Sequence, residues 1–186
     1  MVFSNLIFLY LFLPVCLIAY FFCPGIRAKN AVLILFSLIF YAWGEPVYLL
    51  LMIASAAVNW YFGLLIERRR KKIFLILALV LDLGCLAVFK YAGFFVENLN
   101  AVFGASIPVP QIALPIGISF YTFQALSYTV DVWRGDVPAQ RSFAKLLLYI
   151  SLFPQLIAGP IVRYADVAGQ IDARSFDACL LYTSDA

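Results

Sequence analysis

Long apolar runs, separated by short breaks, constrain the fold of this chain more than any other feature of its sequence. A helix needs about 20 mostly apolar residues to cross the hydrocarbon core of a bilayer. The candidate runs are Val2–Phe22, Ala31–Trp43, Val47–Ile66, Ile73–Phe95, Ile112–Trp133 and Phe143–Ala158. Hydrophobic residues make up 65% of the 186 residues and charged residues only 12%, which is too little polar surface for a soluble domain. We therefore predict an all-α, polytopic transmembrane helical bundle of about six spans.

Breaks in the apolar pattern indicate where the helices end. Pro24-Gly25 follows the first run and Gly44-Glu45-Pro46 the second, while a basic cluster over 68–72 follows the third. The second run is only about 20 Å long by helical rise, so we expect it to borrow residues from its flanks or to lie within protein. Val96–Gln111 is predicted to connect the fourth and fifth runs, and Tyr164–Asp177 to form an interfacial segment.

The sixth run carries an interruption of its own. Phe153-Pro154-Gln155 breaks the apolar pattern, and Ala158-Gly159-Pro160 ends it. Irregular backbone at membrane depth is tolerated only where protein or water surrounds it. We therefore expect this segment to be buried in the bundle.

Basic residues are distributed unequally between alternate loops. The loops after the first, third and fifth runs hold most of them: Arg27, Lys29, Arg68, Arg69, Arg70, Lys71, Lys72, Arg134, Arg141 and Lys145. The other two loops carry Glu45 and Glu97 instead. The positive-inside rule then predicts that the basic loops are cytoplasmic and the N-terminus lies outside. No internal repeat is visible, which argues against an inverted-repeat transporter.

Two ionisable residues lie inside the fourth run, where a charge costs at least about 2.5 kcal/mol at the bilayer centre. Asp82 is at the middle of the run, and Lys90 lies roughly on the same side of the helix. For Lys90 we favour internal pairing or snorkelling to the outer interface. For Asp82 two interpretations stay open, a functional role and a bond to a neighbouring helix.

The fifth run carries a polar and aromatic stripe on one face. At 100° per residue its members fall within about 60° of Gln124. They are Gly117, Phe120, Gln124, Ser127, Tyr128 and Asp131. Such a stripe faces the bundle interior or a water-filled cavity rather than lipid. It is interpreted either as contact between helices or as the wall of a substrate tunnel.

Some functions are excluded by what the sequence lacks. The chain has no histidine, so it contains no histidine base, metal ligand or acyl-transfer residue. Cys16, Cys23, Cys85 and Cys179 show no metal-ligand spacing, and we interpret them as small hydrophobic thiols. The net charge of +3 is too small and too scattered to indicate a nucleic-acid partner.

Several motifs resemble those of membrane-bound O-acyltransferases. They are LPIGISFYTFQ at 114–124, SY at 127–128, DVWRG at 131–135 and FPQLIAGPIVRY at 153–164, with shorter matches in VFS at 2–4, FYAW at 40–43 and FKY at 89–91. The sequence is most similar to the bacterial branch of this family that acetylates alginate and related exopolysaccharides. The resemblance runs from Val2 to about Asp177 in the family's order.

The resemblance implies a ring of helices around a central tunnel, of which residues 1–178 form the N-terminal half. Residues 179–186 do not continue the pattern and are assigned to a separate tail. The implied activity moves acetyl from a cytoplasmic donor, acetyl-CoA or another acyl donor, to hydroxyls of an extracytoplasmic polysaccharide such as alginate. No bound cofactor is implied. The protein would lie in the bacterial inner membrane and work with periplasmic partner proteins.

In this family a histidine in the later half is catalytic, so no catalytic residue is expected in this chain, which alone would be inactive. The candidates for substrate or tunnel contacts are Gln124, Tyr128, Asp131, Arg134, Lys90, Asp82 and Arg163. Gln124 and Tyr128 would supply hydrogen bonds. Lys90 and Arg134 would contact anions near opposite mouths of the tunnel, although anchoring by positive charge explains Arg134 equally well.

Arg163 is assigned to the outer face, where it would meet a polymer carboxylate or a lipid headgroup. Asp82 and Asp131 are the only candidates of this set for a base, and neither has a visible partner that tunes it. Part of a polytopic transporter or permease is the alternative function, because it too would show polar stripes and broken helices. A scaffold subunit without activity of its own is the third.

Overall fold

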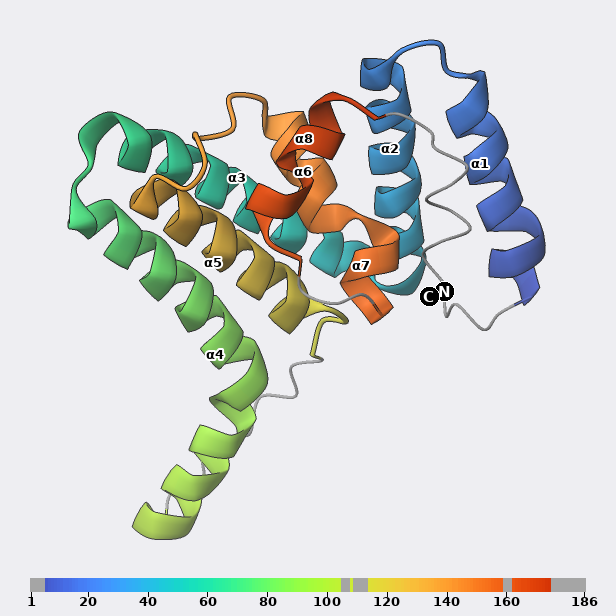
Figure 1. The fold of residues 1–186 in the computed structure, drawn as a ribbon. Coiled ribbons are helices and arrows are strands. Elements are labelled where there is room, and N and C mark those ends of the chain that lie inside the picture. The colour runs from blue at the N-terminus through green and yellow to red at the C-terminus, as the bar shows by residue number, and fades with distance from the viewer. Residues whose placement is uncertain (1–5, 105–107, 109–113, 159–161, 175–186) are drawn as a thin grey trace, which may run out of the picture.

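The computed structural model describes residues 6–104, 108, 114–158 and 162–174. In these ranges the secondary structure is helical throughout, without a strand (Figure 1). A π-helical turn, η1 (Phe8–Phe12), leads into α1 (Leu13–Phe22). It is followed by α2 (Ile26–Gly44), α3 (Pro46–Arg69), α4 (Lys72–Phe103), α5 (Ile118–Arg134), α6 (Phe143–Ser151), α7 (Phe153–Ala158) and α8 (Tyr164–Asp172). The prediction of an all-α fold is confirmed.

Three of these helices, α2, α3 and α4, are long and apolar enough to cross a membrane, and the apolar helix Phe8–Phe22 is shorter. The chain is therefore a membrane protein, but six spans are not confirmed.

α2 begins at Ile26 and so takes in residues from its N-terminal flank, as expected of a short run. α4 continues to Phe103, so the prediction that Val96–Gln111 is a connector is wrong in its first half. The end comes at Gly104, whose φ of 63° favours glycine.

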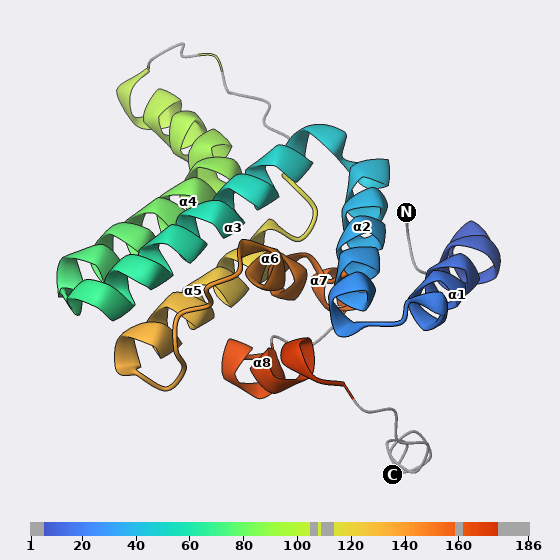
Figure 2. The same ribbon diagram turned by 90° about the horizontal axis from the view of Figure 1, so that it is seen from above.

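α5 lies at the centre of the bundle. It packs against α3 and α4 on one side and against α6, α7 and α8 on the other (Figure 2). Because it has neighbours on so many sides, ten of its 17 residues are buried. The helix begins later than predicted, at Ile118, because Pro115 and Gly117 (φ 77°) hold the preceding residues in a turn; residues 112–113 of the predicted run lie outside the described residues.

The predicted break in the sixth run is confirmed, but the run does not form a single spanning helix. α6 has nine residues, or about 14 Å of helix, which is too short for a hydrocarbon core of about 30 Å. The Tyr149 hydroxyl donates to the carbonyl of Val162 (2.8 Å), so the chain turns back beside α6. At the break, the Phe153 amide donates to Ser37 Oγ on α2 (3.3 Å), which satisfies a backbone group that lipid could not.

Aromatic side chains hold the N-terminal helix to the bundle. Phe8 and Phe12 pack against Phe40 of α2 and Phe153 of α7, with ring centroids 5.5 to 6.0 Å apart. All four rings are buried. Burial of rings in edge-on contacts adds to the packing energy of the cluster. The first helix is thus anchored at the same point as the broken helix.

Gly63 leaves room on α3 for the side chain of Tyr128 from α5. A Cβ at this position would lie 2.5 Å from the hydroxyl oxygen of Tyr128 and 2.8 Å from a ring carbon. Gly84 on α4 is a suitable control for a substitution at Gly63, because a Cβ at position 84 would meet no atom within 4 Å. Only the first glycine is therefore required by packing.

We predict that Gly63→Ala lowers the free energy of unfolding by about 1–3 kcal/mol, because Tyr128 must move to admit a methyl group. Gly84→Ala should be neutral or stabilising, since alanine favours helix. Equilibrium unfolding of the full-length protein in detergent micelles measures both. Equal midpoints for the two variants would contradict the close contact.

Candidate functional site

A buried carboxylate joins α4 to α3. Asp82 is 5% exposed, and its Oδ1 accepts hydrogen bonds from Asn59 Nδ2 (3.0 Å) and Ser55 Oγ (3.4 Å). The interpretation that Asp82 bonds a neighbouring helix is confirmed. The two ion pairs among the described residues do not involve Asp82. A polar pair across two spanning helices is expected to fix their register.

A cavity of about 190 Å³ opens beside this carboxylate, between α3, α4 and α5. Its polar lining consists of Ser55, Asp82, Cys85, Tyr121 and Thr122, and the rest is aliphatic. Asp82 Oδ2 and the Tyr121 hydroxyl are both buried without a hydrogen-bond partner among the described residues. Leaving such groups unpaired costs about 1–3 kcal/mol each. The pair can therefore bind a group that both donates and accepts, such as a hydroxyl.

The polar stripe of α5 turns inward over most of its length. Gln124, Tyr128 and Asp131 are buried, as predicted, whereas Phe120 is 38% exposed because no described helix covers that side of the first turn. Ser127 Oγ donates to Asp131 Oδ2 within the helix (3.5 Å). Gln124 Oε1 is buried without a partner among the described residues. The stripe thus contains side chains that form hydrogen bonds, such as those of Ser127 and Asp131. It also contains the side-chain oxygen of Gln124, which has no hydrogen-bond partner among the described residues.

Tyr128 belongs to a network at the end of the bundle that carries the basic loops. Its hydroxyl accepts from the backbone amide of Gln140 (3.0 Å), and Gln140 Nε2 donates to the hydroxyl of Tyr164 (2.7 Å). Glu67 accepts from the Ala139 amide (2.9 Å) and from Arg141 (2.7 Å). Burial raises the pKa of Tyr164, and the bond from Gln140 partly lowers it. This network positions the loop after α5.

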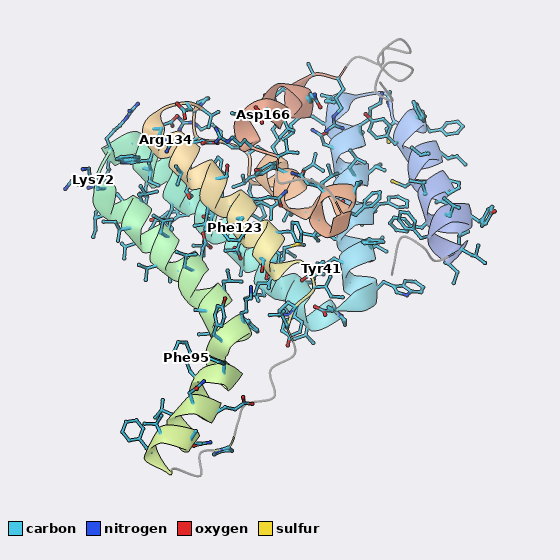
Figure 3. All side chains as sticks on the ribbon, turned by 60° about the horizontal axis from the view of Figure 1, so that its bottom comes forward. Tyr41, Lys72, Phe95, Phe123, Arg134 and Asp166 are labelled. Atoms are coloured by element: carbon cyan, nitrogen blue, oxygen red, sulfur yellow. The ribbon has the colours of Figure 1, made fainter. Side chains whose placement is uncertain are left out.

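The remaining candidates lie apart from one another. Lys90 is exposed, with its Nζ 5.5 Å from the ring centre of Tyr91. Arg134 is exposed at the end of α5, near Lys72 at the start of α4 (Figure 3). Arg163 directly precedes Tyr164, which contacts Gln140, so it lies in the half of the bundle with the basic loops. The assignment of Arg163 to the outer face stays a prediction.

The sequence pattern missed Glu67, Gln140 and Tyr164. Glu67 opens a basic cluster, and its two acceptor bonds to residues 139 and 141 depend on a loop that returns to α3. Gln140 and Tyr164 lie outside the apolar runs in which intramembrane polar residues stand out. In the described residues, no group of three or more Cys, Asp or Glu side chains could hold a metal ion.

Known proteins match this chain over nearly its whole length. It is 42% identical to a probable alginate O-acetylase of Pseudomonas aeruginosa, over 94% of the chain and 35% of the relative. The Azotobacter vinelandii protein of the same name is 42% identical, over 94% of the chain and 37% of the relative. A peptidoglycan O-acetyltransferase of Helicobacter pylori is 31% identical, over 91% of the chain and 38% of the relative.

The chain therefore spans little more than a third of the length of the curated relatives it matches. No family model and no solved structure matches it. The similarities nevertheless confirm the resemblance to O-acetyltransferases of the exopolysaccharide branch that the motifs indicated.

We predict a coupled contribution of Asp82 and Asn59 to stability. Asp82→Leu and Asn59→Leu should each cost about 1–3 kcal/mol of unfolding free energy, because each removes the hydrogen bond between α3 and α4 and leaves its buried partner bonded only to Ser55. The double variant should cost less than the sum by about 1 kcal/mol. Asn98→Leu is the control, since Asn98 lies about 24 Å along α4 from Asp82 and should add to Asp82→Leu without coupling. Additivity in both cycles would show that the pair contributes no interaction energy.

Proposed function

We propose that this chain, a homologue of the alginate O-acetylases over 94% of its length, forms the helical wall of a membrane O-acetyltransferase. The activity moves acetyl from acetyl-CoA or another acyl donor to hydroxyls of an extracytoplasmic polysaccharide such as alginate. The donor is a co-substrate, and no cofactor is resident. Similarity to proteins named for acetylation of two different polymers carries this proposal and favours transfer over transport.

The protein is placed as a multi-pass protein of the bacterial inner membrane, with its N-terminus outside and its basic loops in the cytoplasm. The packing supports one shared end for these loops. Glu67 at the end of α3 binds Arg141 in the loop before α6, and Lys72 and Arg134 lie at the same end of α4 and α5 (Figure 3). The acyl donor approaches at this end, and periplasmic partner proteins receive the acetyl group at the other.

The cavity beside Asp82 and Tyr121 (the Asp82–Tyr121 cavity) is the hydroxyl-binding element of this part of the protein. Acyl transfer to a hydroxyl needs a base, a polarised carbonyl and exclusion of water. The chain has no histidine, so its own residues orient rather than activate. Asp82 Oδ2 accepts from the bound hydroxyl and the Tyr121 hydroxyl donates to it, while the aliphatic lining excludes water.

The test expresses the full-length protein with its partner proteins and follows labelled acetyl from acetyl-CoA into extracted polysaccharide. Tyr121→Phe should lower the rate of labelling about tenfold, because it removes one hydrogen bond to the acceptor. Tyr61→Phe removes the same hydroxyl from an exposed tyrosine of α3 that does not line the cavity and should leave the rate unchanged.

Two outcomes would contradict this account at different levels. If the full-length protein with its partners labels no surface polymer, acetyl transfer is the wrong function. If labelling occurs but Tyr121→Phe matches Tyr61→Phe, the cavity takes no part in it.

A further inference from the structure

A second cavity, of about 410 Å³, lies where α2 and α6 begin. The two helices lie side by side (Figures 1 and 2). The polar lining of this α2–α6 cavity is Arg27, Asn30, Ser142 and Lys145, and the remainder is small or aliphatic. It shares none of these residues with the Asp82–Tyr121 cavity.

Every charged side chain that lines the α2–α6 cavity is positive. Arg27 is exposed and forms no ion pair among the described residues. Lys145 pairs with Asp172 of α8, which does not line the cavity. The charge at the cavity is therefore +1 after that pairing, and an anion is the complementary ligand.

Backbone donors add to this charge. The first amides of a helix have no partner within it, and they carry the positive end of the helix dipole. Neither Gly25 before α2 nor Ser142 before α6 makes a side-chain cap bond. Two helix N-termini, the unpaired cation of Arg27 and the ammonium of Lys145, which is shared with Asp172, thus meet at one cavity, and this combination suits a phosphate group.

Asn30 indicates what else the ligand must carry. It is 7% exposed, and its Nδ2 donates to the carbonyl of Ile171 (2.9 Å), which fixes the orientation of the amide. Its Oδ1 is buried without a partner among the described residues. This oxygen only accepts, so it would repel a bare phosphate and needs a hydroxyl or an N–H group instead.

We propose that the α2–α6 cavity binds a phosphate ester that carries a hydroxyl or N–H donor beside the phosphate. Arg27, Lys145 and the helix ends bind the phosphate, and Asn30 accepts from the donor group. A phospholipid headgroup and a soluble phosphate ester both have this chemistry. If the soluble ester is the ligand, the site rests on the acetyl transfer proposed above and would hold its donor. Binding is measured without turnover, so failure of this site and failure of acetyl transfer are distinguishable.

The experiment measures binding to the purified full-length protein in two arms. Coenzyme A in neutral detergent represents the soluble source. Phosphatidylglycerol in nanodiscs represents the lipid source, and phosphatidylcholine, which has a phosphate but no donor, is its control. At least one of coenzyme A and phosphatidylglycerol should bind, and phosphatidylglycerol should exceed phosphatidylcholine if the lipid is the ligand.

Charge variants separate this site from general attraction to a basic surface. The double variant Arg27→Gln/Lys145→Gln should weaken binding at least tenfold. The matched control Lys71→Gln/Lys72→Gln removes the same charge from exposed residues outside the cavity and should change binding less than twofold. Equal losses in the two double variants, or binding of neither ligand, would overturn the proposal.

Asp172→Asn tests the site by a gain of phosphate binding, which a loss of folding would not produce. It releases Lys145 from its carboxylate, so phosphate binding should tighten two- to fivefold although the tie between α6 and α8 is weakened. Weaker binding in this variant would show that Lys145 serves only to hold α8, and would also overturn the site.

Discussion

The structure depends on the contact of Tyr128 with Gly63, where the absence of a side chain on α3 leaves room for the tyrosine ring of α5. This contact allows α5 to lie deep between neighbours on several sides. The Tyr128 hydroxyl then reaches the amide of Gln140, and its ring meets that of Tyr164 at 5.1 Å. One small residue on α3 thus fixes the position of α5, of the loop that follows it and of α8.

Polar groups inside the bundle are satisfied across helices rather than by solvent. Tyr41 of α2 donates to the carbonyl of Ile116 (3.0 Å), and the Ile116 amide donates to Glu45 (2.9 Å), which holds the turn before α5. Ser37 accepts from the amide at the start of α7. Because lipid offers no partner to such groups, each bond ties an irregular segment to a regular helix. Other buried polar atoms have no partner among the described residues, and those of Asp82, Tyr121 and Asn30 belong to residues that line cavities.

The sequence predicts the helices well and their connections poorly, for a physical reason. Apolar runs and breaks are local, so the all-α fold, the break at Phe153 and the bond from Asp82 to a neighbouring helix could all be predicted. The course of the chain after the break is not local. The apolar pattern of the sixth run indicates one span, so the return of the chain beside Tyr149 and Gln140 could not be predicted from it. Glu67 could not be recognised for the same reason, since its partners lie 72 and 74 residues further on.

The composition of α5 follows from its central position. A helix in contact with lipid must be apolar on its outer face, but α5 has few such positions because α3, α4, α6, α7 and α8 surround it. It can therefore carry Gln124, Tyr128 and Asp131 without exposing them to hydrocarbon. Its 17 residues fall below the length of a typical span, so length and apolarity do not by themselves identify the helix around which this bundle is organised.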